Sequence, residues 1–146
     1  MYRWLAQQIA AARQPHLHLV EGPADEQLHQ AIGATKLAAP RSYKVFVLEL
    51  GNCRLFRVAG SDDEYLLEVM SELRQMQTRD GTTYEWFGSY QNRPACFRGD
   101  LLAGERESPV FEWHGGNGTG RFRETAPGFR PWLKRRFGQA RQSFSE

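Results

Sequence analysis

The sequence predicts a single α+β domain, spanning 1–146, with helices mostly near the N-terminus, a closing C-terminal helix and a largely antiparallel or mixed sheet of about five strands. Three observations predict this class. Apolar residues recur at helical spacing over much of the first half, alternate in short runs between residues 82 and 125, and return to helical spacing after Pro127. A chain of 146 residues buries enough surface to fold as one unit without disulfide bonds.

The N-terminal segment predicts a short helix followed by an extended stretch. Leu5, Ile9 and Ala12 share one face of this helix, which ends before Pro15 because a proline disfavours helical backbone in the residue ahead of it. Residues 16–20, HLHLV, then alternate in a way that suits a short strand or an extended connector.

Two further helices and a strand are predicted before residue 60. The stretch 21–33 has an acidic first turn and a terminal glycine, which are typical of a short helix. A second helix follows Pro40 and stops at Gly51, with apolar residues at positions i, i+3, i+4 and i+7, namely Tyr43, Phe46, Val47 and Leu50. The run 53–60, CRLFRVAG, predicts a strand, so the junction is helix, glycine turn, strand.

The stretch 62–77 also reads as a helix. Ser61 and Glu64 have capping-box spacing, and one face carries the apolar residues Leu66, Val69, Met70 and Leu73. On the opposite face Glu64, Glu68 and Glu72 recur every four residues and would form an acidic ridge for a basic protein partner. The alternative is an ordinary solvated face, because amphipathic helices direct charge outward in any case.

Strands dominate the next fifty residues. TTYEWFGSY, PACFRGDL and SPVFEWH predict three strands, and GRFRET predicts a fourth. The glycine-rich GGNGTG before this last strand predicts a hairpin connection rather than a phosphate-binding loop, because a phosphate loop would be followed by a helix. Tyr84 and Trp86 share a strand face, as do Phe111 and Trp113; they suit a core or half-buried face, with an aromatic stacking platform as the alternative.

A last helix starts at Pro127, with Phe129, Leu133, Phe137 and Ala140 along its apolar side. Arg130, Lys134 and Arg141 lie nearly in line beside that side, where they could contact an acidic partner or nucleic acid. Trp132 lies off the apolar side and either packs or is exposed for a partner. The candidate partner-binding residues are therefore Glu64, Glu68, Glu72, Arg130, Trp132 and Lys134.

The order of these elements resembles the SUKH superfamily, which includes fungal cell-wall-assembly regulators of the killer-toxin-resistance type and bacterial toxin-immunity proteins. The resemblance rests on IGATKLAAPRSYKVFVLELGN, WFGSYQNRPACFRGDL and PVFEWHGGNGTGRFRETAPGFRPWLKRRF. These are similar to the family's proline-tyrosine-phenylalanine helix ending in glycine-asparagine, to its central strands, and to its tryptophan hairpin with an aromatic-rich closing helix. The predicted helix over Asp62 to Gln77 has no evident equivalent in that pattern.

The resemblance implies a non-enzymatic domain whose partner is a protein. In this family the domain is most often an immunity protein that occludes a polymorphic toxin, commonly a nuclease, encoded nearby. A regulatory or scaffolding adaptor with a housekeeping partner is the alternative. The family has no shared catalytic residue, so we expect no catalytic site and no cofactor.

Residue counts and spacings agree with this expectation. Two cysteines, Cys53 and Cys96, are too few for a disulfide framework and are expected to be buried thiols. His16 and His18 could provide two metal ligands, but a third at a recognisable spacing is missing. A formal charge of +2 disfavours a dedicated nucleic-acid binder. The N-terminal sequence lacks the pattern of a secretion signal and no run is long enough for a membrane span, so a cytoplasmic location is expected.

Overall fold

The computed structural model describes residues 1–12, 18–22, 38–116 and 119–144, and it is an α+β domain as predicted. Within these residues a seven-stranded antiparallel sheet has the simple strand order β1-β2-β3-β4-β5-β6-β7. The strands are β1 (Leu19–Gly22), β2 (Asn52–Arg57), β3 (Tyr65–Gln77), β4 (Thr83–Tyr90), β5 (Arg93–Arg98), β6 (Val110–His114) and β7 (Arg121–Ala126). The number of strands therefore exceeds the predicted five.

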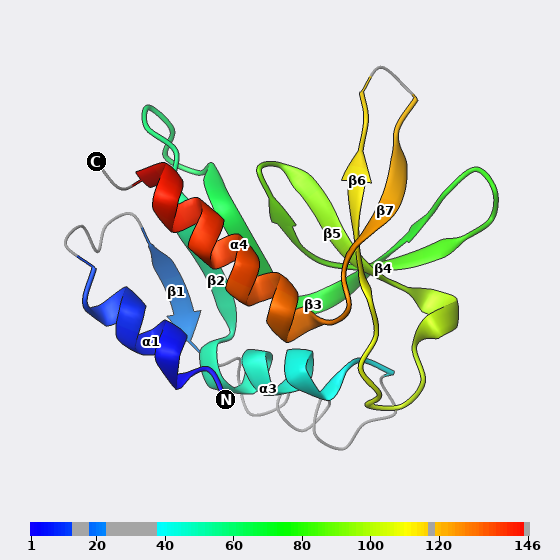
Figure 1. Cartoon of the computed structure of the whole chain (residues 1–146), viewed down its shortest axis with the longest axis horizontal. Helices are drawn as coiled ribbons and strands as arrows, with labels where there is room; N and C mark the ends of the chain where they lie inside the picture. Colours follow the sequence, from blue (N-terminus) through cyan, green and yellow to red (C-terminus); the bar gives the residue numbers. More distant parts are fainter. Residues whose placement is uncertain (13–17, 23–37, 117–118, 145–146) are drawn as a thin grey trace.

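Three α-helices accompany this sheet in the described part of the chain: α1 (Arg3–Ala10), α3 (Arg41–Leu50) and α4 (Phe129–Phe144). A short 3-10 helix, η2 (Gly99–Leu101), follows β5. Figure 1 shows α4 crossing one face of a curved sheet, with α1 and α3 beside it. The predicted helix over 21–33 falls almost wholly outside the described residues, as does His16.

The junction between α3 and β2 has the predicted order. Pro40 immediately precedes α3, and Gly51 ends it by donating its N–H to the carbonyl oxygen of Val47 at 3.0 Å. The backbone of Gly51 has φ 66° and ψ −137°, a combination that side-chain-bearing residues avoid. The glycine thus turns the chain directly from helix into strand, and the predicted apolar residues of α3 are all buried against the sheet.

The helix predicted over 62–77 is wrong, because this stretch is the strand β3. It is paired with β2 and β4, with Leu67 opposite both Leu55 and Tyr90. Tyr65, Leu67 and Val69 are buried at strand spacing, so the helical periodicity read from the sequence was accidental. The Ser61 hydroxyl does accept the Glu64 N–H at 3.1 Å, but this contact closes the turn between β2 and β3 rather than a helix.

The four strands predicted between residues 82 and 125 are confirmed as β4 to β7. The glycine-rich stretch lies between β6 and β7, which pair antiparallel with Trp113 opposite Phe122. It is therefore the predicted hairpin connection, of which residues 117–118 lie outside the described part.

The main core lies between the helices and one face of the sheet. Phe129, the first residue of α4, is at its centre, with its ring edge-on to those of Tyr43, Phe46 and Phe87 at centroid distances of 5.3–5.5 Å. Tyr43 also ties α3 to β3, because its hydroxyl donates to the Met70 carbonyl oxygen at 2.7 Å. These contacts fix the N-terminal ends of α3 and α4 side by side.

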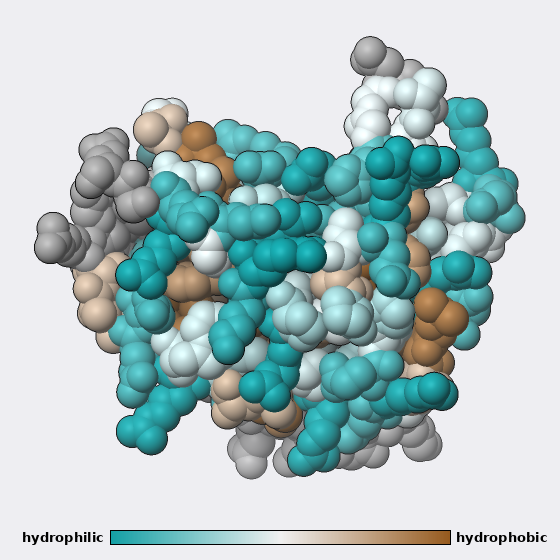
Figure 2. All heavy atoms as spheres, viewed as in Figure 1, coloured by the Kyte–Doolittle hydropathy of each residue, from teal (hydrophilic) through white to brown (hydrophobic). Residues whose placement is uncertain are grey.

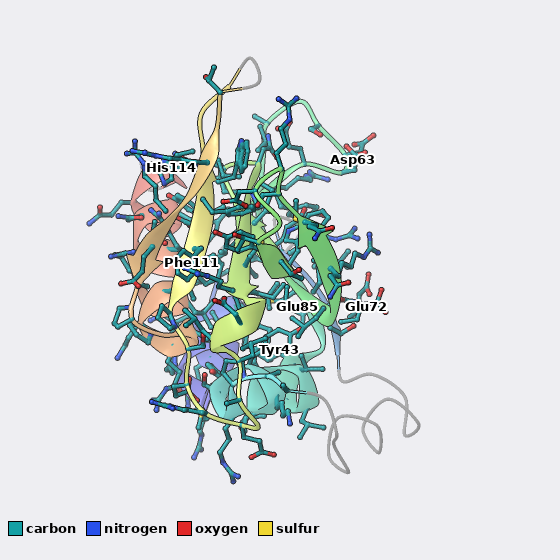
Figure 3. All side chains as sticks on the ribbon, turned by 90° about the vertical axis from the view of Figure 1, so that its right-hand side faces the viewer. Tyr43, Asp63, Glu72, Glu85, Phe111 and His114 are labelled. Atoms are coloured by element: carbon teal, nitrogen blue, oxygen red, sulfur yellow. The ribbon has the colours of Figure 1, made fainter. Side chains whose placement is uncertain are left out.

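A second, smaller cluster lies on the other face of the sheet. Phe111 lies between Val110 and Glu112, both directed to the main core, so its own ring points the opposite way. Figure 3 looks toward this side, with Phe111 labelled on the sheet and Tyr43 near the helical layer. The cluster consists of Tyr84, Cys96, Phe111, Met76, Trp86 and Phe122. The aromatic residues predicted for a half-buried sheet face are thus mostly in this cluster.

Candidate partner-binding groove

A largely apolar groove of about 540 Å³ lies where α1, α3 and α4 begin. Segments far apart in the sequence meet here: the N-terminal residues, the first turn of α3, and the first two turns of α4. Figure 2 shows that the face seen in this view is largely hydrophilic, with a few separate apolar patches. The volume lies within the range of ligand pockets in general, and the groove opens to solvent.

The floor of the groove is aromatic and rigidly held. Tyr2 is buried, its ring is edge-on to Phe46 at 5.1 Å, and its hydroxyl donates to the Ser42 carbonyl oxygen at 2.7 Å. Trp4 is half-buried and packs edge-on against Phe137 at 5.7 Å. Pro127 and Pro131 complete the apolar lining.

Glu107, from the loop between η2 and β6, forms the polar wall. Its carboxylate accepts the Ser42 N–H at 3.1 Å and also the Ser42 hydroxyl proton. The same loop is tied to the start of α3 by a bond from the Arg41 N–H to the Glu105 carbonyl oxygen at 2.9 Å. Because the helix lacks a side-chain cap of its own, Glu107 satisfies one of its free amides and places a negative charge at its N-terminus.

The rim of the groove is positively charged. Arg130 and Lys134 are exposed on successive turns of α4, and neither forms an ion pair with any residue that the structure describes. Burial raises the pKa of Tyr2, the nearby positive charge of Arg130 opposes this rise, and the negative charge of Glu107 adds to it. Arg41 lies 3.4 Å from Glu105, but both side chains are largely exposed, so this ion pair is weak.

Of the candidate residues on the last helix, two lie in the groove and one does not. Arg130 and Lys134 line it together, as their spacing on one helix face suggested. Trp132 is fully buried, and its indole N–H donates to the Glu112 carboxylate at 2.8 Å, so it belongs to the core and is accessible to no partner. Sequence reasoning missed the contribution of Trp4 and Arg41, because only the fold brings the N-terminal helix and α3 to α4.

The acidic candidates do not form a ridge. In an extended strand, four residues span about 13 Å, more than twice their separation along a helix, and each carboxylate has a different surrounding. Glu64 accepts from the Asn92 side-chain amide at 2.5 Å, and Glu72 lies 3.6 Å from Arg74. Figure 3 shows Asp63, the neighbour of Glu64, well separated from Glu72.

Glu68 lies between these two on β3, opposite Arg54 of β2 and away from the main core. Burial raises its pKa, and the positive charge of Arg54 opposes that rise. The three carboxylates are therefore separate residues of a sheet surface rather than one acidic surface.

A second hollow, of about 550 Å³, is polar and lies between the β3–β4 hairpin and η2. Arg98 lines it and binds the Asp100 carboxylate through two bonds of 2.7 and 3.0 Å. Its main positive charge is thus already compensated by a neighbouring residue of the chain.

Neither Cys53, Cys96 nor His18, all within the described residues, is placed for catalysis or metal binding. Cys53 and Cys96 are both buried, and burial raises the pKa of Cys53 to about 12, so its reactive thiolate form is suppressed. The His18 Nδ1 atom accepts the Phe56 N–H at 3.2 Å, which occupies one potential ligand atom. The residues that the structure describes include no group of three potential metal ligands.

Comparisons with known proteins do not assign this chain to a family. No protein-family model matches the sequence, and neither the curated proteins nor the solved structures include a significant match. Of the helices in the described ranges, none has the length and hydropathy needed to cross a membrane.

Proposed function

We propose that this chain is a SUKH-type protein-binding domain, and specifically an immunity protein that binds and neutralises a toxin domain encoded nearby, within the cell that produces it. The groove carries the proposal. Its polar groups are used to hold the scaffold: Glu107 caps α3, and the Tyr2 hydroxyl is bonded to the Ser42 carbonyl oxygen. What it presents to solvent is an apolar floor and a positively charged rim, which is the composition of a docking surface rather than of a catalytic centre.

Two features of the described residues fit this proposal. The helix from Arg41 to Leu50, its glycine stop and the strand that follows have the order that the family pattern requires. The helix over 62–77, which had no equivalent in that pattern, does not exist in the structure. On this proposal the mechanism is occlusion, in which the domain covers the toxin's active site or its substrate-binding surface without chemistry of its own.

The first experiment is to co-express the chain with the C-terminal domain encoded by the neighbouring large open reading frame. We expect the two to co-purify, to bind with saturable one-to-one stoichiometry by calorimetry, and to restore growth to cells that the domain alone would kill. If the two proteins do not associate and growth is not restored, the immunity proposal fails. An unbiased pull-down from the native cell would then test the adaptor function instead.

A further inference from the structure

We infer that the groove at the start of α3 and α4 takes an acidic segment of the partner protein, with one aromatic or large aliphatic side chain seated on the groove floor. This inference rests on the proposed function and specifies where the partner docks and what its chemistry is. It follows from three properties of the groove: a preformed apolar floor, two positive charges that form no ion pair within the described part of the chain, and a carboxylate that is hydrogen-bonded to Ser42.

The floor is ready to receive an apolar side chain. Tyr2 supports the floor from below, because its hydroxyl bond to Ser42 and the rings around it hold it in place and only 1% of its surface is exposed. The apolar surface that a ligand would meet comes from Trp4, Pro127 and Pro131. Trp4 is partly buried against the core, with its ring edge-on to Phe137, and it also lines the groove. Rigid aromatic residues in a concave site provide most of the affinity in many protein interfaces.

The rim selects for negative charge. Arg130 and Lys134 lie in the first two turns of α4, where the positive end of the helix dipole adds to their own charges. Glu107 opposes an acidic ligand, because hydrogen bonds from the neutral amide and hydroxyl of Ser42 leave its negative charge in place, but the two cations Arg130 and Lys134 outnumber it. The remaining field favours carboxylates beside the apolar anchor, and it would accelerate their encounter with the groove.

The second hollow, between the β3–β4 hairpin and η2, lacks these properties. Its main cation, Arg98, is already paired with Asp100, and Glu85 and Asp80 add negative charge to its lining. An acidic segment would be repelled there, so charge complementarity distinguishes the two hollows.

The test uses a defined probe and the full chain. A blocked hexapeptide with two acidic residues on each side of a Trp-Leu pair is titrated into the labelled protein, and backbone and indole N–H signals are followed by NMR. Two analogues serve as controls, one with the acidic residues changed to their amides and one with alanines in place of Trp-Leu. We expect saturable shifts centred on Trp4, Arg41 and Arg130, and about tenfold weaker binding of either analogue.

A pair of matched charge reversals locates the site. The double variant R130E/K134E is expected to raise the peptide Kd about tenfold, because both rim charges are inverted. R121E/R123E changes the net charge equally at two exposed β7 residues outside the groove, and we expect its Kd to stay within about twofold of the original.

Three results would overturn the inference: no saturable shift at up to roughly 5 mM peptide, shifts centred away from the groove, or equal weakening by the two double variants. Because the peptide assay does not use the toxin domain, its failure is distinguishable from failure of the proposed function. A chain that still protects cells but does not bind the peptide would use another surface.

Discussion

Glu112 on β6 lies in the core with none of its surface exposed to water. Two residues of α4 hold its carboxylate. Trp132 donates its indole N–H to it at 2.8 Å, and Arg136 donates from Nε at 3.0 Å and from a terminal nitrogen. The Arg136 guanidinium also lies 4.5 Å above the centre of the Tyr90 ring. This network fixes α4 on the sheet, and through α4 it fixes the rim of the groove.

Removing the Glu112 charge should therefore destabilise the fold. We expect Glu112→Gln to lower the free energy of unfolding by about 3 kcal/mol, because Arg136 is left nearly buried without its counter-charge. Glu124→Gln, at an exposed residue of β7, is the control and should change stability by less than about 0.5 kcal/mol. Denaturant unfolding of the three proteins measures both values, and equal stability of the two variants would contradict the role assigned to Glu112.

The stabilisation that Glu112 provides should depend on pH. Burial raises the pKa of Glu112, but the bonds from Arg136 and Trp132 outweigh burial and hold it below the usual 4.5. The unfolded chain therefore takes up this proton more readily, so the stabilisation is complete above pH 4.5 and is lost as the pH falls through the folded-state pKa. The stability difference between the original chain and Glu112→Gln should shrink below about pH 4.5, and a constant difference down to about pH 3 would be the opposite result.

At the scale of elements, the turn from α3 into β2 depends on one glycine. Gly51 adopts φ 66° and ψ −137°, so Gly51→Ala should cost about 1–3 kcal/mol of stability. Gly138→Ala is the matched control: this glycine lies within α4, with open space where a Cβ would be added, and alanine there should stabilise by up to about 1 kcal/mol. Thermal unfolding of both variants gives the sign of each stability change. If Gly51→Ala left stability unchanged, the junction would tolerate another backbone conformation.

How far the elements could be predicted from the sequence depended on whether local residues decide them. The helix from Arg41 to Leu50 has its own stop residue and a consistent apolar face, and it was found with its bounds nearly correct. The stretch 65–77 has no such local determinant. Its glutamates and leucines suit a helix, and only pairing with β2 and β4, along with burial of Leu67 and Val69, makes it a strand.

Only part of the groove could be predicted from the sequence, for a related reason. Arg130 and Lys134 are four residues apart on one helix, so their common face follows from helical periodicity alone. Their placement beside Trp4 and Arg41 depends on the packing of three helices against the sheet, which no local pattern encodes. For Trp132 the sequence left both packing and exposure open. It is buried because Glu112, a residue on another element, accepts its indole N–H in the core.

At the scale of the whole molecule, curvature gives the sheet a core on both faces. Phe122 of β7 stacks on Tyr84 of β4 with ring centroids 4.1 Å apart. These strands are separated by β5 and β6, so a flat sheet would hold them about 14 Å apart. The curvature therefore brings the β3–β4 and β6–β7 hairpins together on the face opposite the helices. The second cluster, which includes Tyr84, Phe111 and Phe122, stabilises that shape.

Stability and binding should then be separable, because the second cluster and the groove lie on opposite faces of the sheet. We expect Phe122→Ala to lower the free energy of unfolding by about 1–2 kcal/mol, since a half-buried ring contributes less than a fully buried one. The same variant should bind the acidic peptide with unchanged affinity, whereas Trp4→Ala should weaken that binding, because it removes part of the groove floor. Denaturant unfolding tests the prediction about stability, and the peptide titration tests the prediction about binding. A loss of peptide binding in Phe122→Ala would show that the curl of the sheet also sets the shape of the groove, whereas retained binding would assign the two faces to separate tasks, one to stability and one to recognition.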